Sequence, residues 1–255
     1  MIFRWSFWGQ QKKDNIELLR YSIASFQKQF GSTHSYIVYT DDAGFVSSKL
    51  GVSADIRQFP SDGSGQFCFS AKPTWQKWCP STRLDISQDE FFVDSDVFLV
   101  KYPEEIDSIL SDQKVKFAIL DEYKGQPYQH GAMYRKTSRD TPFINAGFFL
   151  QKAGSDISND LLRECEWWKQ NVAEDEHTHH DEQGALAIAL TEYLKKDELV
   201  ILPKDKYMLI SETSNPDVEN LDHVTLFHAT YPTHPAFYKF KYVLDEILGF
   251  YPNHH

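Results

Sequence analysis

Two aspartates separated by a single residue, Asp94 and Asp96, follow the apolar run 91–93 and precede the apolar run 97–100. Side chains two residues apart on an extended strand project from the same face, so this spacing predicts two neighbouring carboxylates. Burying them together is costly, because desolvation and mutual repulsion both oppose ionisation. A divalent cation such as Mg²⁺ or Mn²⁺ would relieve both costs. The alternative is a strand end at which both carboxylates cap a loop or a helix.

A histidine at the end of a later apolar segment could add to this site. His228 follows Leu226 and Phe227, which read as a strand. Such a histidine is usually packed in the core, but a neutral imidazole could also complete a metal site begun by two carboxylates. His234, a few residues later, is a further candidate for contacting substrate.

Small and polar residues interrupt the predicted strand 143–150. Asn145, Ala146 and Gly147 stand inside it, and both Asn and Gly weaken strands. Small residues would let a ligand approach the backbone closely. A β-bulge explains the same pattern equally well.

Polar residues also open the predicted helix 181–194. Asp181 occupies a natural N-cap position, which a structural role would explain. Glu182 and Gln183 in the first turn could reach sugar hydroxyls. The nearby histidines 177, 179 and 180 favour a solvated loop, because the His-Glu-x-x-His spacing of a zinc site is missing.

The remaining segments predict strands alternating with helices. We expect strands at 2–8, 34–40, 54–59, 91–96, 115–120, 143–150, 199–202 and 224–227, and helices at 15–30, 72–79, 159–170, 181–194 and 237–250. This alternation predicts a mostly parallel α/β sheet with helices on both faces, which binds ligands at the carboxyl ends of its strands. No glycine-rich phosphate loop of the dinucleotide-binding or P-loop kind occurs, so a nucleotide diphosphate would need a metal clamp.

Composition indicates an ordinary globular protein of 255 residues with 15% aromatic residues. The formal charge of −11 argues against a general nucleic-acid binder, which usually carries a basic face. Cys68, Cys79 and Cys165 have spacings typical of neither a disulfide framework nor a zinc site, so we expect reduced thiols and a cytoplasmic location.

No membrane span is expected, because no stretch approaches about 20 apolar residues. The aromatic C-terminal stretch 237–251 carries Lys239 and Lys241 and could contact a membrane surface. A packed terminal helix is the favoured interpretation of that stretch.

The order of the motifs resembles that of the GT-A glycosyltransferases. The resemblance is to the metal-dependent, sugar-nucleotide-using group that includes the glycogenin and lipopolysaccharide galactosyltransferase-like families. It runs from the first strand to His228 through segments 39–42, 71–73, 94–96, 145–149, 181–183 and 227–228. It implies a single GT-A domain over 1–255, a Rossmann-like fold with a nucleotide-binding half at 1–100 and an acceptor-binding half at 101–255.

The resemblance also implies residue roles. The metal ligands would be Asp94, Asp96 and His228. The donor site would be formed by Lys72, Asp94, Ser95, Asp96, Asn145, Ala146 and Gly147, and the catalytic set by Asp181, Glu182 and Gln183. Related families often have Asp-Gln-Asp in the last motif, so the choice between Asp181 and Glu182 as functional carboxylate stays open.

The implied activity is transfer of a sugar from a nucleotide-diphosphate sugar to a saccharide or glycolipid acceptor with Mn²⁺ or Mg²⁺. The donor would be a UDP- or GDP-sugar, with UDP favoured over GDP. A sugar-phosphate nucleotidyltransferase is one alternative, although residues 2–11 lack the usual glycine-rich basic loop. A carbohydrate- or nucleotide-binding module with a structural metal is the other.

Overall fold

The computed structural model describes residues 1–9, 12–68, 73–122, 125–230 and 233–250. The first half of the chain contains β1 (Ile2–Phe7), α1 (Lys12–Phe30), β2 (Ser35–Thr40), α2 (Ala43–Lys49), β3 (Asp55–Gln58), the 3₁₀ helix η1 (Pro73–Trp78), β4 (Glu90–Val93), β5 (Val97–Leu99), α3 (Glu104–Ser111) and β6 (Phe117–Asp121). The second half contains η2 (Pro127–Lys136), β7 (Ile144–Gln151), α4 (Ser158–Asn171), η3 (Glu174–Glu176), α5 (Asp181–Lys195), β8 (Leu199–Leu202), β9 (Tyr207–Ile210), β10 (Leu226–Ala229) and α6 (Pro235–Leu248).

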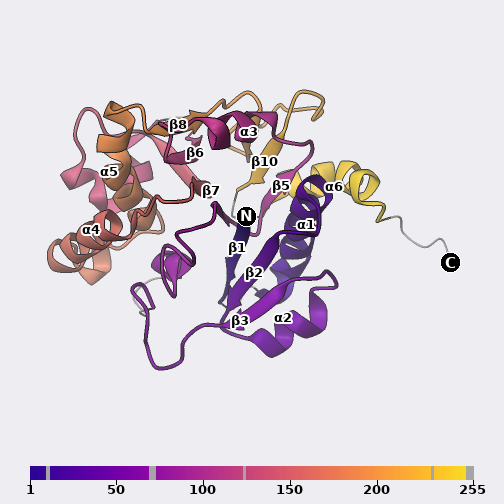
Figure 1. Cartoon of the computed structure of the whole chain (residues 1–255), viewed down its shortest axis with the longest axis horizontal. Helices are drawn as coiled ribbons and strands as arrows, with labels where there is room; N and C mark the ends of the chain where they lie inside the picture. Colours follow the sequence, from indigo (N-terminus) through magenta and orange to yellow (C-terminus); the bar gives the residue numbers. More distant parts are fainter. Residues whose placement is uncertain (10–11, 69–72, 123–124, 231–232, 251–255) are drawn as a thin grey trace.

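Seven strands form the central sheet in the order β3-β2-β1-β4-β7-β6-β8. All neighbouring pairs are parallel except those of β7, which is antiparallel to both β4 and β6. In Figure 1, α4 and α5 lie at one side of the molecule and α1 with α6 at the other. The predicted α/β class with a mostly parallel sheet is therefore confirmed.

A second, three-stranded sheet has the order β5-β10-β9. β10 pairs antiparallel to β5 and parallel to β9. Helix α6 packs on this sheet and lies beside α1, where the Tyr21 ring meets the Phe237 ring edge-on at 5.3 Å. The aromatic C-terminal stretch thus forms a packed helix, as the favoured interpretation expected.

The buried stripe of α1 follows the predicted helical spacing. Leu19, Ile23 and Phe26 are fully buried. Gly31 ends the helix with a φ of +82°, a left-handed conformation that costs glycine little, and its N–H donates to the carbonyl of Gln27 at 2.9 Å. The helix begins at Lys12, earlier than the predicted start at 15, and several other boundaries differ by one or two residues.

One predicted strand end is wrong. Strand β4 ends at Val93, and residues 94–96 form a turn in which the N–H of Val97 donates to the carbonyl of Asp94 at 3.2 Å. The chain leaves the central sheet at this turn because β5 pairs with β10. The two carboxylates are therefore not placed by strand alternation. Helices α2, α3 and η2 and strands β5 and β9 were not predicted as separate elements.

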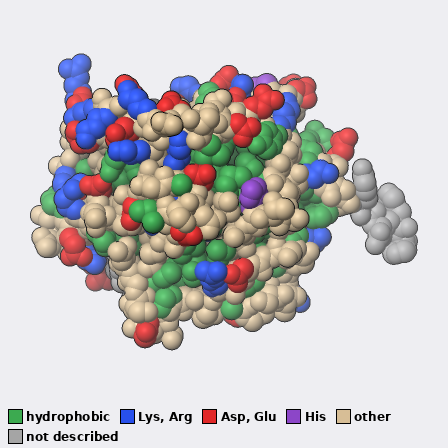
Figure 2. Space-filling view, viewed as in Figure 1, with side chains coloured by type: hydrophobic (Ala, Val, Ile, Leu, Met, Phe, Trp, Pro, Cys, Tyr) green, Lys and Arg blue, Asp and Glu red, His purple; other side chains and the backbone are tan. Residues whose placement is uncertain are grey.

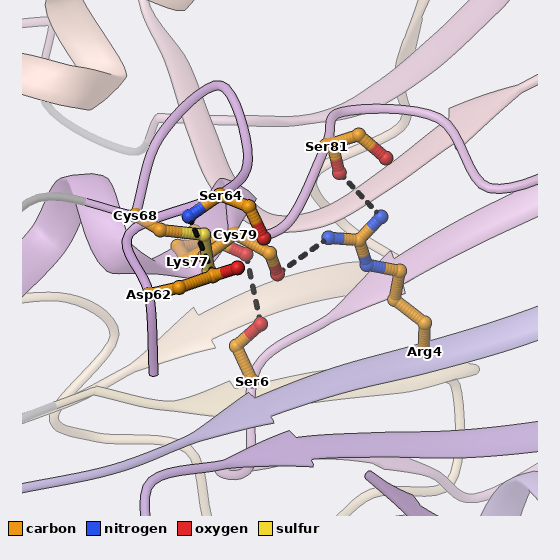
Figure 3. Close-up of a disulfide and its surroundings, with 8 residues drawn as sticks. All are labelled: Arg4, Ser6, Asp62, Ser64, Cys68, Lys77, Cys79 and Ser81. Atoms are coloured by element: carbon orange, nitrogen blue, oxygen red, sulfur yellow. Dashed lines mark hydrogen bonds between the residues drawn. A yellow bond between two sulfur atoms is a disulfide. The ribbon is translucent and has the colours of Figure 1, made fainter. Parts of the chain in front are cut away.

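The expectation of reduced thiols is wrong for two of the three cysteines. Cys68 and Cys79 form a disulfide, with Cα atoms 5.0 Å apart (Figure 3). The fold brings them together because the N–H of Gln66 bonds to the carbonyl of Pro80, so the two segments run side by side. Cys165 is a free, buried thiol, and burial raises its pKa to about 12.

The surface carries mixed charge. On the face shown in Figure 2, acidic and basic side chains are interspersed and gather mainly along the upper edge. None of the described helices is long and apolar enough to cross a membrane.

Candidate functional site

A cavity of about 720 Å³ opens at the edge where the parallel strands of the central sheet end. Its lining comes from the end of β1, the start of α1, the turn after β4, helices η1 and η2, the segment after β6, the start of β7, the start of α5 with the residues before it, and the ends of β9 and β10 with the segments after them. Because β7 runs antiparallel, its first residues lie at the same edge as the carboxyl ends of β4 and β6. This is the edge at which open α/β sheets bind ligands.

Asp94, Asp96 and His228 converge in this cavity. One potential ligand atom from each lies within 4.8 Å of the other two. The N–H of Ala229 donates to the carbonyl of Asp96 at 2.9 Å, and Nε2 of His228 lies 3.2 Å from Oδ1 of Asp96. Pairing of β10 with β5, which starts directly after the turn, therefore brings this histidine to the carboxylates.

The three side chains suit a divalent cation. Oδ1 of Asn145 accepts from the N–H of Gly147 at 2.9 Å and faces Nδ1 of His228 at 3.0 Å. Since this oxygen is an acceptor, Nδ1 of the imidazole carries a proton. Burial would lower the pKa of His228, but the Asp96 carboxylate outweighs burial and raises it, so Nε2 donates to Oδ1 of Asp96 when no ion is bound. A cation at this place would replace the Nε2 proton and be bound by the Nε2 lone pair. The Asn145 amide in turn donates to Oε2 of the buried Glu122 at 3.2 Å. Two carboxylate oxygens and one oriented imidazole nitrogen are ligands that Mn²⁺ or Mg²⁺ sites can use.

Gly147 makes room for that imidazole. A Cβ atom at this position would lie 2.5 Å from both Cε1 and Nδ1 of His228, which is too close for any side chain. The pairing register between β6 and β7 also shifts between Ile119 and Leu120, whose partners are Phe149 and Asn145. The Asn-Ala-Gly break thus coincides with an irregularity of the sheet and leaves room for the histidine, and Ala146 is buried beside it.

Lys77 is a cavity residue that the sequence analysis missed. Its ammonium lies 2.8 Å from Oδ1 of Asp94 and 4.0 Å from Oε1 of Glu182, and the residue is 5% exposed. Burial would lower the pKa of Lys77, but the two carboxylates outweigh burial and hold it above its ordinary value. The sequence feature that could have indicated this buried lysine is its place between Trp75 and Trp78. Both tryptophans are fully buried in the structure.

Two hydrogen bonds from β1 hold the backbone at Lys77 and at the nearby Cys79. The carbonyl of Lys77 accepts a hydrogen bond from Oγ of Ser6 at 2.8 Å, next to the disulfide at Cys79 (Figure 3). The carbonyl of Cys79 accepts from the buried guanidinium of Arg4 at 3.1 Å. Lys72, the basic residue singled out in the sequence, lies outside the described residues.

The two candidate carboxylates at the start of α5, those of Asp181 and Glu182, have different surroundings. Glu182 lines the cavity and accepts from Nε1 of Trp78 at 3.1 Å. Burial raises the pKa of Glu182 to about 7, although the Lys77 ammonium opposes this shift. Gln183 also lines the cavity, and its Oε1 accepts from the N–H of Ala146 at 3.2 Å.

Asp181 is not among the residues that line the cavity. Its fully buried carboxylate accepts from the backbone N–H of Ala132 and from Nε1 of Trp168, both at 2.8 Å, and from the hydroxyl of Thr178 at 2.6 Å. These bonds join the start of α5 to η2 and α4. The Asp181 carboxylate is therefore placed to stabilise the fold at the start of α5.

The cavity rim is aromatic and hydroxyl-rich. Tyr128 is 61% exposed, and its ring lies 5.9 Å from that of His180. Burial, together with the neighbouring His179, lowers the pKa of His180 to about 4, so this imidazole is neutral at pH 7. The sequence favoured a solvated loop for histidines 177, 179 and 180. Instead, His179 and His180 line the cavity and the ring of His177 stacks on Trp168. Ser211, Thr213, Ser214 and Thr230 complete the rim on the side of β9 and β10.

Searches by sequence find no family model and no curated protein that matches this chain. Its structure is similar to the galactosyltransferase LgtC in complex with donor and acceptor sugar analogues, with 12% identity, a TM-score of 0.53 and coverage of 99% of this chain and 98% of that one. An active-site mutant of LgtC gives 14% identity, a TM-score of 0.55 and the same coverage.

Two further structures share the arrangement. Mouse xyloside xylosyltransferase 1 in its apo form is 12% identical, with a TM-score of 0.53 over 91% of this chain and 99% of that chain. The bifunctional glycosyltransferase WbbM is 11% identical, with a TM-score of 0.58 over 99% of this chain and 50% of that one. At these identities the likeness establishes the fold, and the predicted GT-A fold is confirmed.

Proposed function

We propose that this chain is a metal-dependent glycosyltransferase that takes a sugar from a nucleotide-diphosphate sugar, UDP- rather than GDP-linked, and passes it to a saccharide or glycolipid acceptor. The convergence of Asp94, Asp96 and His228 in the cavity of a GT-A fold carries the proposal. Residues 1–100 would form the nucleotide-binding half and residues 101–255 the acceptor-binding half. The similar LgtC structure was determined with donor and acceptor sugar analogues, which supports a site that takes both a donor and an acceptor.

Asp94, Asp96 and His228 would hold Mn²⁺ or Mg²⁺. The ion, when bound, would supply Lewis-acid stabilisation of the departing diphosphate. Ser95 lies in the turn between the two aspartates, lines the cavity and would face the donor. Lys77 would place a positive charge near the phosphates, where negative charge develops as the sugar leaves.

The sugar would be oriented by Glu182, Gln183 and the segment 145–147. Glu182 is the functional carboxylate of α5 in this proposal, because it lines the cavity and Asp181 does not. A pKa of about 7 suits a group that accepts a proton near neutral pH. Asp181 would act indirectly, by holding the start of α5 against η2.

The Cys68–Cys79 disulfide removes the basis for the expected cytoplasmic location, which was the expectation of reduced thiols. Disulfides persist mainly in oxidising compartments. A role in polysaccharide or glycolipid synthesis fits the proposed activity in either compartment.

The test is a panel of UDP- and GDP-sugars screened by thermal shift with and without Mn²⁺. A ligand present at 100 times its Kd adds about 2.7 kcal/mol to the unfolding free energy, which such a scan detects. The expected result is one UDP-sugar that raises the melting temperature only with Mn²⁺ and is slowly hydrolysed. Asp96→Asn should abolish both effects, while Tyr238→Ala on the exposed face of α6 should change neither.

The outcomes separate the alternatives. A binding module would bind the nucleotide with Mn²⁺ but leave the donor intact. A nucleotidyltransferase would release pyrophosphate from a nucleoside triphosphate and a sugar phosphate. Unchanged nucleotide affinity of Asp96→Asn in the presence of Mn²⁺ would refute the metal assignment.

A further inference from the structure

A second histidine contacts the proposed metal ligand Asp96. Nδ1 of His234 lies 3.2 Å from Oδ2 of Asp96 and 2.7 Å from the carbonyl oxygen of Ala229. Both neighbours are acceptors, so Nδ1 must carry a proton and donate it. The imidazole therefore joins the carboxylate to the end of β10.

The two oxygens of Asp96 face different histidines. Oδ1 lies 3.2 Å from Nε2 of His228, and Oδ2 lies at the same distance from His234. Asp96 is 9% exposed and His234 is 8% exposed, so water solvates neither group well. A buried carboxylate needs such a donor, and the donor also fixes its rotation. With Oδ2 held by His234, Oδ1 is directed toward His228 and the proposed cation.

The backbone of His234 is unusual in a way that serves this contact. Its φ of +49° and ψ of +47° lie in the left-handed region, which is uncommon for any residue other than glycine, although His is enriched there with Asn and Asp. The next residue, Pro235, begins α6 and fixes the direction of the helix. The left-handed turn lets the imidazole point back to Ala229 and Asp96, whose contacts can compensate the backbone strain.

We propose that His234 is a positioning residue that orients Asp96 for the divalent cation without binding the cation itself. The inference rests on the metal site of the proposed function. It is supported by the Nδ1 contacts of His234, which are to Oδ2 of Asp96 and the carbonyl of Ala229. Among the described residues, the group that could hold a metal ion consists of Asp94, Asp96 and His228. Hydrogen-bonded partners of metal ligands typically contribute about 10–100-fold to metal affinity.

The test uses two substitutions that both tolerate a left-handed backbone. His234→Gly removes the donor and keeps the backbone conformation. His234→Asn also accepts this conformation, and its side-chain amide can donate from about the position of Nδ1. Affinity for Mn²⁺ alone is measured by calorimetry and by the electron paramagnetic resonance of free Mn²⁺, without any sugar donor. Circular dichroism verifies the fold of each variant.

We expect His234→Gly to weaken Mn²⁺ binding about 10–100-fold and His234→Asn to stay within about threefold of the wild type. Tyr238→Ala, on the same helix but with its side chain exposed, should bind Mn²⁺ as the wild type does. Wild-type affinity in a folded His234→Gly protein would overturn the positioning role. Equal loss in His234→Asn would also overturn it, because the imidazole would then be needed as a ligand. A wild-type protein that binds no Mn²⁺ would instead refute the metal site of the proposed function, and the positioning role with it.

Discussion

The ammonium of Lys77 lies 2.8 Å from Oδ1 of Asp94 and so joins η1 to the turn after β4. The same nitrogen lies 4.0 Å from Oε1 of Glu182 at the start of α5. One buried cation thus balances two cavity carboxylates from distant parts of the chain. The charge state of the cavity therefore depends on a residue of an irregular 3₁₀ segment.

Replacing Lys77 with Gln should destabilise the protein more at pH 8 than at pH 5. Removing one partner of a buried ion pair typically costs about 3–5 kcal/mol, because the remaining charge is left uncompensated. At pH 5 a protonated Glu182 needs no counter-charge, so the loss should be smaller. Urea unfolding at both pH values measures the difference. Lys114→Gln, which removes an exposed pair with Asp197, should change stability by less than about 1 kcal/mol at either pH.

The raised pKa of Glu182 predicts a pH dependence of stability in metal-free protein. Its folded-state pKa of about 7 exceeds the ordinary 4.5, so the folded state binds more protons between these values. Stability from this group is therefore full below about pH 4.5 and falls as the pH rises to about 7, by about 3 kcal/mol. Glu182→Gln should lose this slope, and its stability relative to the wild type should rise across that window in urea unfolding with chelator present. A difference that does not vary with pH would contradict the assignment.

Gly147→Ala should displace the imidazole of His228. The added Cβ would lie 2.5 Å from two atoms of that ring, so the ring must move away from Asp96. We expect at least a tenfold loss of Mn²⁺ affinity by calorimetry, comparable with losing a hydrogen-bonded partner of a metal ligand. Gly44→Ala is the matched control, because its Cβ would meet one atom at an ordinary 3.8 Å and Ala favours the helix α2. Unchanged affinity in Gly147→Ala would show that the ring position is not critical.

Reduction of the Cys68–Cys79 disulfide should lower the unfolding free energy by about 2–4 kcal/mol. Melting curves with and without dithiothreitol measure the change, and the Cys68→Ser and Cys79→Ser double variant should melt like the reduced protein. Thiol titration of the unfolded, unreduced chain should find one free thiol, that of Cys165. Three free thiols in freshly purified, unreduced protein would restore the expectation of reduced cysteines.

Local patterns in the sequence predicted much of the fold. The helical spacing of Leu19, Ile23 and Phe26, together with Gly31, fixed the buried face and the end of α1. Alternating strands and helices predicted a mostly parallel sheet, because each apolar face must be covered by another element. The sequence also indicated a site at Asp94, Asp96 and His228, because these polar residues stand beside apolar runs. A buried polar group needs a compensating partner.

Only the tertiary structure decided how these groups meet. The chain turns after Val93 into a second sheet, and strand pairing there places His228 beside Asp96. Because β7 is antiparallel to both β4 and β6, Asn145 and Gly147 at its start lie at the edge where those two strands end. The position of Lys77 depends on the packing of η1 against distant elements. The spacing of apolar residues along the chain does not predict such packing. Residue spacing reports which side chains are buried along one element, whereas partners from distant elements depend on strand order and register.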